Sequence, residues 1–209
     1  MTPDAFVDFL GTECASAILR TDVAEAAAPA MDAAIRGGFR VVEFTLTIPD
    51  VYERIGEFAA RDGVVVGAGT VLTVEQARAA VEQGARFLVS PVVDEAVIEE
   101  ATRLGVAMMP GTHTPTEMLR AHRAGAQLQK LFPAPGIGPA YVASCLGPLP
   151  FLRIVPTNGA DETNARAWLD AGAHALGFVA PLFDAGEVRD GRADLIEARA
   201  RRLLDAVRA

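Results

Sequence analysis

The stretch VVVGAGTVLTVEQARAAVEQGARFLVSPVVDEAVIEEATRLGVAMM, residues 64–109, shows most clearly how this chain folds. Short apolar runs at Val64–Ala68, Arg86–Val89 and Val106–Met109 alternate with longer amphipathic segments at Thr73–Glu82 and Asp94–Arg103. The apolar runs are continuous instead of alternating in polarity, which is typical of parallel strands buried on both faces. The stretch therefore predicts strands joined by helical crossovers.

The same alternation continues in both directions along the chain. Further strands are expected at Ala17–Arg20, Arg40–Thr45, Gln127–Leu131, Leu152–Val155 and Ala173–Val179. Further helices are expected at Asp22–Arg36, Pro49–Ala60, Pro115–Arg123, Pro139–Leu146, Asp161–Ala171 and Ala193–Val207. Several helices stop at a glycine before the next strand, as Gly84, Gly105 and Gly125 illustrate.

Eight strand–helix units predict an α/β protein, a single (β/α)8 TIM barrel that spans residues 1–209 as one domain. The additional segment Pro3–Leu10 is expected to be an N-terminal helix that caps the bottom of the barrel. A doubly wound open sheet is the alternative, because spacing along the sequence cannot show whether the sheet closes.

Composition excludes several classes of function. The net charge of −8 argues against a surface that binds nucleic acid or an anionic membrane. No apolar run approaches the roughly 18 residues of a membrane span. The N-terminal residues carry acids instead of the basic start of a signal peptide, so we expect a cytoplasmic protein.

Lysine is nearly absent from this chain. Of its 19 basic residues, 18 are arginines, and Lys130 is the one lysine. Arginine stays protonated, whereas a desolvated lysine can become a neutral amine nucleophile. Lys130 is therefore a candidate for chemistry that arginine cannot perform, although a single lysine can also survive by chance in a sequence biased toward arginine.

Active sites of TIM barrels lie at the carboxyl ends of the strands. Lys130 ends the sixth expected strand among apolar neighbours, and Glu43 is expected to point into the same cavity from the second. This pair can support imine chemistry, with Lys130 as nucleophile and Glu43 moving protons. The alternative is a structural role, in which Glu43 pairs with Lys130 or Arg20 in a buried ionic cluster.

Other motifs give weaker signals. Gly67–Thr70 (GAGT) is expected to be a tight loop at a strand end, and it lacks the spacing of a dinucleotide fingerprint. His113 has no second histidine or acid at the spacing of metal ligands, so no metal is expected there.

At these residues the chain resembles the family of 2-keto-3-deoxy-6-phosphogluconate aldolases, which includes the 6-phosphogalactonate and 4-hydroxy-2-oxoglutarate aldolases. The resemblance runs from about Ala17 to Ala206. Its most specific motif is KLFPA at 130–134. It is supported by AILR at 17–20, VVEFTLT at 41–47, VGAGTVL at 66–72, SP at 90–91, PGTHTPTE at 110–117 and PTNGA at 156–160.

The resemblance implies a class I aldolase on a (β/α)8 barrel, without cofactor or metal, and usually a homotrimer. It implies that Lys130 forms the Schiff base and that Glu43 is the general acid/base, working with a water. The residues implied to contact the keto acid substrate are Arg20 and Thr70 at its carboxylate, Pro91 and Phe132 around the imine, and Thr157 and Gly159.

Two departures from the family pattern concern the ends of the substrate. Thr47 stands where many phosphogluconate aldolases have arginine, so carboxylate binding is expected to rest on Arg20 alone. Asn158, Val179 and Ala180 replace the small and hydroxyl-bearing residues of the phosphate-binding segments. Backbone N–H groups cradle phosphate best where glycine allows close approach, so a weakened phosphate site is expected.

The sequence therefore predicts an aldolase that cleaves a 2-keto-3-deoxy (phospho)sugar acid or a 4-hydroxy-2-keto acid to pyruvate and an aldehyde. Three alternatives stay open at this point. They are a related barrel that acts on a non-phosphorylated keto acid, a different pyruvate-lyase or decarboxylase reaction from the same imine, and a keto-acid-binding protein with little turnover.

Overall fold

Eight parallel strands form the centre of the computed structural model, which describes all 209 residues. The strands are β1 (Ala15–Leu19), β2 (Val41–Thr45), β3 (Val65–Gly69), β4 (Phe87–Ser90), β5 (Ala107–Thr112), β6 (Gln129–Leu131), β7 (Ile154–Pro156) and β8 (Leu176–Phe178). Their order is β7-β6-β5-β4-β3-β2-β1-β8. An isolated parallel bridge between Thr157 and Gly177 joins the two ends of this order. The barrel prediction is confirmed, and the open-sheet alternative is wrong.

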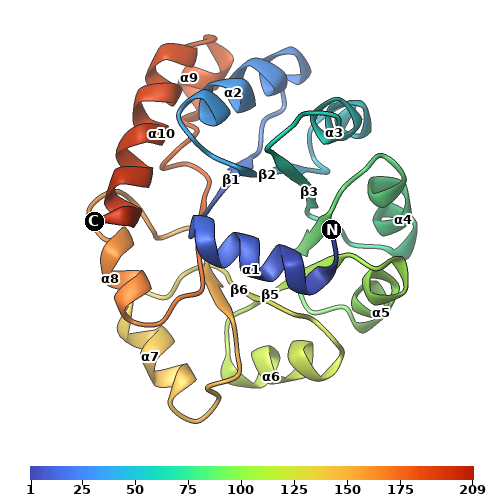
Figure 1. Ribbon diagram of the computed structural model, residues 1–209, viewed down its shortest axis with the longest axis vertical. Helices are drawn as coiled ribbons and strands as arrows, with labels where there is room; N and C mark the ends of the chain where they lie inside the picture. Colours follow the sequence, from blue (N-terminus) through green and yellow to red (C-terminus); the bar gives the residue numbers. More distant parts are fainter.

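Helices surround the strands (Figure 1). They are α1 (Pro3–Glu13), α2 (Ala24–Arg36), α3 (Val51–Ala59), α4 (Val74–Glu82), α5 (Glu95–Leu104), α6 (Pro115–Arg123), α7 (Ala140–Leu146), α8 (Ala165–Asp170), α9 (Ala185–Arg189) and α10 (Ala193–Arg208). None of them combines the length and the apolar character that a bilayer-spanning helix needs.

Local signals in the sequence explain where several helices begin and end. Thr114 and Glu117 form a reciprocal capping box at the start of α6, and Pro115 occupies the first turn. Gly105 ends α5 in a left-handed conformation with φ of 72°. Helix α6 consequently has the predicted bounds, and α5 differs by one residue at each end.

Two differences from the predicted elements have local causes. Helix α8 begins at Ala165 instead of Asp161, because residues 161–164 form a turn. In this turn Asp161 N–H donates to Asn164 Oδ1 at 2.9 Å. Helix α9 was not predicted. Its start is fixed by Asp184, whose carboxylate accepts hydrogen bonds from Gly186 N and Glu187 N at 2.9 and 3.0 Å.

Helix α1 closes the bottom of the barrel and lies across its centre in Figure 1. Its buried residues Phe6, Val7 and Leu10 join one core cluster with the lower inward-facing strand residues. Phe6 stacks on Phe87 with ring centroids 4.4 Å apart, and His174 Nε2 lies 2.9 Å from the Val7 carbonyl oxygen. The predicted capping helix is confirmed and extends to Glu13.

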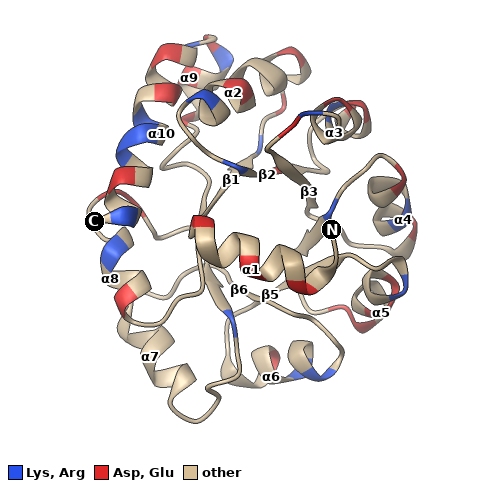
Figure 2. Cartoon of the chain, viewed as in Figure 1, with Lys and Arg blue, Asp and Glu red and all other residues tan.

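A larger apolar core lies between the outer face of the strands and the surrounding helices. Charged residues lie mostly on these outer helices (Figure 2). Ion pairs such as Arg36–Glu197, at 2.9 Å, join α2 to α10 on that surface. Ionisable side chains inside the barrel are therefore the exceptions that need an explanation.

Candidate active site

The stagger of the strands decides which side chains meet inside the barrel. Start at Ile18, cross to its register partner on the next strand, and then move one residue toward the carboxyl end of that strand. Repeating these two steps across all eight strands leads back to Ile18. With this stagger, inward-facing side chains form layers of four that come from alternate strands.

Four such layers lead from the closed bottom toward the mouth. They contain Ser16, Gly67, Met109 and Val155; then Glu43, Val89, Lys130 and Gly177; then Ile18, Gly69, Gly111 and Thr157; then Thr45, Pro91, Phe132 and Val179. The two ionisable residues share one layer, on the opposite strands β2 and β6, and both are buried (0 % and 6 % exposed).

Glu43 is buried without a partner. Neither of its carboxylate oxygens has a hydrogen-bond partner in the protein, and no ion pair joins it to Lys130 or Arg20. Burial raises the pKa of Glu43 above its ordinary value, and the positive charges of Lys130 and Arg20 oppose that rise. The structural alternative, a paired ionic cluster, is therefore not what the structure contains.

The glycine-rich segment makes room for this carboxylate. A Cβ at Gly69 would collide with Glu43 Oε1, and a Cβ at Gly67 would lie 2.5 Å from the Phe87 ring. Gly67–Gly69 belong to strand β3, so the expected loop at this segment is wrong. Glycine is required at both positions, because the side chains of Glu43 and Phe87 occupy the space beside β3 that a Cβ would fill.

Lys130 sits in apolar surroundings. Its Nζ lies 5.2 Å from the centroid of the Phe132 ring, and Thr112 Oγ1 donates to the Lys130 carbonyl oxygen at 3.0 Å, which ties β6 to β5. Burial lowers the pKa of Lys130 below its ordinary value. The Glu43 carboxylate acts against this shift, and the Arg20 charge adds to it. The structure thus favours a neutral amine at this position.

Arg20 and Thr70 come together at the rim, above the ends of β1 and β3. Arg20 is exposed, and its Nη2 donates to Thr70 Oγ1 at 3.4 Å. Thr70 has a left-handed backbone with φ of 62°. A guanidinium beside a hydroxyl at a barrel mouth can bind a carboxylate.

The other predicted site residues lie around the mouth. Pro91 and Phe132 share a layer above Lys130. They also line a cavity of about 250 Å³ together with Gly111, His113, Glu117 and Arg120, and neither Lys130 nor Glu43 lines this cavity. A Cβ at Gly111 would collide with the Pro91 backbone, so glycine is required for this close approach. Thr157 is fully buried in the layer between Lys130 and Phe132.

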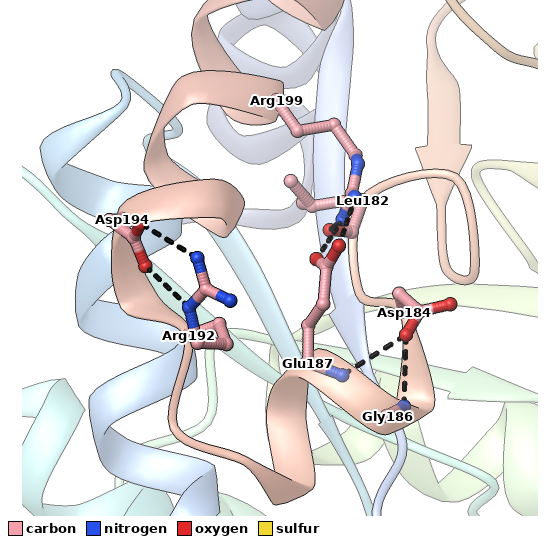
Figure 3. A network of polar contacts seen from close by, with 7 residues as sticks. All are labelled: Leu182, Asp184, Gly186, Glu187, Arg192, Asp194 and Arg199. Carbon is pink, nitrogen blue, oxygen red and sulfur yellow. Dashed lines mark hydrogen bonds and ion pairs between the residues drawn. The ribbon is translucent and has the colours of Figure 1, made fainter.

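The segments after β7 and β8 form the remaining side of the mouth. Asn158 and Gly159 have left-handed backbones, with φ of 64° and 141°. Val179 is half-buried and faces the mouth, and Ala180 is exposed. Figure 3 shows how the chain beyond Ala180 is fixed: Arg199 donates to the Leu182 carbonyl oxygen at 3.0 Å and to Glu187 Oε1 at 2.8 Å.

Some polar strand-end residues do not enter the interior. Ser90 Oγ donates to the Val92 carbonyl oxygen at 2.6 Å, and His113 Nδ1 lies 3.0 Å from the Pro133 carbonyl oxygen.

Sequence reasoning missed Ser16 and the spacing role of Gly69 and Gly111. The period-two alternation along each expected strand could have placed Ser16 on the inner face, but only the register shows that it lies near Glu43.

This arrangement can perform carbonyl chemistry. A buried neutral amine is a nucleophile for ketones, and a carboxyl group with a raised pKa can accept and return a proton near neutral pH. No three Asp, Glu, His or Cys side chains gather where they could hold a metal ion.

Comparisons with known proteins give a consistent result. The family model described as KDPG and KHG aldolase matches residues 11–198. The chain is 38% identical over 180 residues to the probable 2-dehydro-3-deoxy-6-phosphogalactonate aldolase of Rhizobium meliloti (strain 1021), which covers 83% of this chain and 85% of that protein. It is 34% identical over 174 residues to the 2-dehydro-3-deoxy-6-phosphogalactonate aldolase of Escherichia coli (strain K12), with coverage of 82% and 85%.

A solved structure described as native KDPGal has the same fold. It superimposes with a TM-score of 0.85 at 31% sequence identity, over 93% of this chain and 94% of that chain.

The unpartnered Glu43 carboxylate should destabilise the folded protein at alkaline pH. Its raised folded-state pKa means that the unfolded chain releases this proton first, so the destabilisation grows as pH rises above the ordinary glutamate pKa. We expect Glu43→Gln to increase the free energy of unfolding by about 1–2 kcal/mol at pH 8, and by less at pH 5, in urea titrations.

Glu117→Gln is the matched control. Backbone N–H groups of His113 and Thr114 lower the pKa of Glu117, so this variant should lose stability at pH 8 instead. A Glu43→Gln variant that is also less stable at pH 8 would mean that the carboxylate has a stabilising partner.

Proposed function

Since this chain belongs to the KDPG and KHG aldolase family and is a class I aldolase, we propose that Lys130 is its Schiff-base lysine. The observation that carries this proposal is the position of Lys130. It is the sole lysine of the chain, it is buried, and it shares a layer of the barrel with Glu43 without an ion pair. Its lowered pKa supplies the free amine that attack on a ketone requires.

The reaction begins at the C2 ketone of a 2-keto acid. The Lys130 nitrogen forms a bond to C2, the C2 oxygen gains a proton and later leaves as water, and a protonated imine remains. The imine withdraws electrons from C3. Glu43, as carboxylate, takes the C4 hydroxyl proton, the C3–C4 bond breaks, and its electron pair moves into an enamine. The aldehyde leaves, C3 regains a proton, and hydrolysis releases pyruvate.

The residues at the mouth are proposed to hold the two ends of the substrate. Arg20 and Thr70 are in hydrogen-bond contact, at 3.4 Å, and form a place for the C1 carboxylate. Pro91 and Phe132 are proposed as the walls around the imine, because they share the layer of the barrel above Lys130. Thr157 and Gly159 line the side toward which the sugar-derived chain extends.

Reductive trapping tests the nucleophile. Borohydride with pyruvate should add one pyruvate-derived group to the protein, located on Lys130 by peptide mapping. Lys130→Arg keeps the charge but cannot supply a neutral amine, so it should lose trapping and at least about 1,000-fold in kcat/KM for aldol cleavage.

Glu43→Gln serves as the comparison variant in that test. It should still form the trapped adduct, because Lys130 is intact, while cleavage is strongly reduced. Aldol cleavage by Lys130→Arg at the parental rate would sink the Schiff-base assignment.

The phosphate end of the substrate is a second question. We propose that this enzyme prefers non-phosphorylated 2-keto-3-deoxy acids. Val179 places a branched side chain at the mouth, which crowds the place where backbone N–H groups would hold a phosphate. Ala180 offers no hydroxyl group that could donate a hydrogen bond to that phosphate. Asn158 likewise brings a side chain to a left-handed position where glycine would leave the backbone open.

Substrate comparison tests this preference. The parent enzyme should cleave a non-phosphorylated keto-deoxy hexonate at least as efficiently as its 6-phosphate. The double variant Val179→Gly, Ala180→Ser should raise kcat/KM for the phosphate ester by about 10-fold through new hydrogen bonds and leave the other substrate little changed. A strong parental preference for the phosphate ester would contradict the proposal.

We also propose that residues 1–209 form one catalytic domain, that three copies assemble, and that the enzyme works in the cytoplasm. Exposed Leu72 and Val92, at 47% and 52%, follow the neighbouring strands β3 and β4 and offer apolar surface for a second copy.

Sedimentation velocity should give the mass of three 22.0 kDa chains, and Val92→Asp should weaken the assembly. A monomer at micromolar concentration would contradict the trimer.

A further inference from the structure

Two arginines without acidic partners border one cavity beside the mouth of the barrel. Arg20 directly follows β1, Arg189 is the last residue of α9, and both side chains are exposed. Together with Thr47, which lies beyond the end of β2, they line a cavity of about 350 Å³. Neither arginine forms an ion pair, although the chain has a net charge of −8. Both guanidinium groups are therefore free to bind an anion.

Helix α9 is held so that Arg189 faces this cavity. On one side of the helix, Arg199 of α10 donates to Glu187 Oε1 at 2.8 Å (Figure 3). Arg189 follows Glu187 by two residues, which is about 200° around a helix, so it lies on the side opposite to Arg199. Ala185 and Val188 line the cavity with Arg189, at the i, i+3, i+4 spacing of a single helix face.

The cavity adjoins the barrel mouth at two points. Thr47 Oγ1 lies 2.9 Å from the hydroxyl oxygen of Thr45, which belongs to the inward-facing layer at the mouth. Arg20 reaches from the end of β1 to Thr70 beyond β3, a contact of 3.4 Å, and β2 lies between these two strands. The guanidinium group of Arg20 therefore spans the carboxyl end of β2, between the cavity and the interior.

The charge of Arg20 also acts on the two reacting groups. It opposes the rise in the pKa of Glu43 and adds to the fall in the pKa of Lys130. In a 2-keto acid the carboxylate is bonded directly to the ketone carbon. One molecule can therefore place its carboxylate at Arg20 and its ketone carbon at Lys130.

Arg20 alone is a weak anchor for that carboxylate. Water screens an exposed ion pair, and the contact of Arg20 with Thr70 is long. A carboxylate has two oxygens, which can accept hydrogen bonds from two separate guanidinium groups. Asp22 also lines the cavity, so its walls carry two positive charges and one negative charge. The cavity is therefore still attractive to an anion.

We propose that Arg189 supplies a second guanidinium group for the C1 carboxylate of the substrate, which it binds across the cavity from Arg20. This proposal rests on the proposed Schiff-base function. Arg189 is then a specificity-determining residue, because it favours 2-keto acids over uncharged ketones and takes no part in bond formation or cleavage. Its removal should raise KM and leave kcat nearly unchanged.

The pyruvate dependence of borohydride trapping tests this role. Arg189→Met should raise the half-saturating pyruvate concentration about 5-fold, as expected for the loss of one exposed charge pair. Arg189→Lys keeps the positive charge and should restore most of the affinity. Arg192→Met is the matched control and should behave like the parent, because Arg192 pairs with Asp194 at 3.2 Å and does not line the cavity.

Methyl pyruvate separates binding of the carboxylate from a structural role. This ester presents the same ketone without a negative charge, so its half-saturating concentration should be equal for the parent and Arg189→Met. An equal loss of affinity for the ester and for pyruvate would mean that Arg189 only maintains the shape of the mouth, which overturns the proposal. In aldol cleavage, Arg189→Met should raise KM by a similar factor, with kcat within about twofold of the parent.

The same trapping experiment distinguishes the two levels of the proposal. A parent that forms the Lys130 adduct and an Arg189→Met variant with the parental pyruvate dependence contradict the role of Arg189 alone. A parent without an adduct at any pyruvate concentration contradicts the proposed function and, with it, this inference.

Discussion

Two ionisable side chains, Glu43 and Lys130, are held in one layer of the barrel interior, and neither is neutralised by an ion pair. Desolvation therefore moves their pKa values in opposite directions, toward a neutral amine and a protonated carboxyl. A contact pair would have cancelled both shifts. The separation of these two groups across the barrel is the constraint on which the chemistry of this protein depends.

Glycines provide the space that this constraint requires. Gly69 accommodates the Glu43 carboxylate, Gly111 lets β5 approach Pro91, and Gly177 leaves the inner face of β8 without a side chain. The lower barrel is filled instead, by Phe87 and by Phe6 of α1, whose rings stack at 4.4 Å. The ionisable layer with Glu43 and Lys130 therefore lies directly above this packed lower half of the barrel.

Much of the fold could be predicted because its signals are local. Continuous apolar strands, amphipathic helices and capping residues such as Thr114 depend on neighbours within a few residues. The unpredicted helix α9 and the late start of α8 also have local causes. They depend on single hydrogen bonds, at Asp184 for α9 and at Asn164 for α8, which no periodic pattern of residues reveals. The glycines of the GAGT segment were misread as a loop, because their reason lies on the neighbouring strands β2 and β4.

The sequence by itself determined the α/β class, the eight strand–helix units, and the identity of the sole lysine and its family motif, since these are properties of order and residue type. Only the tertiary structure decided that Glu43 faces Lys130 across one layer, that no ion pair joins them, and that Ser16 and Thr157 flank Gly177. The physical reason is the stagger of the strands. Which residues share a layer depends on all eight registers together, and no single segment of the sequence contains that information.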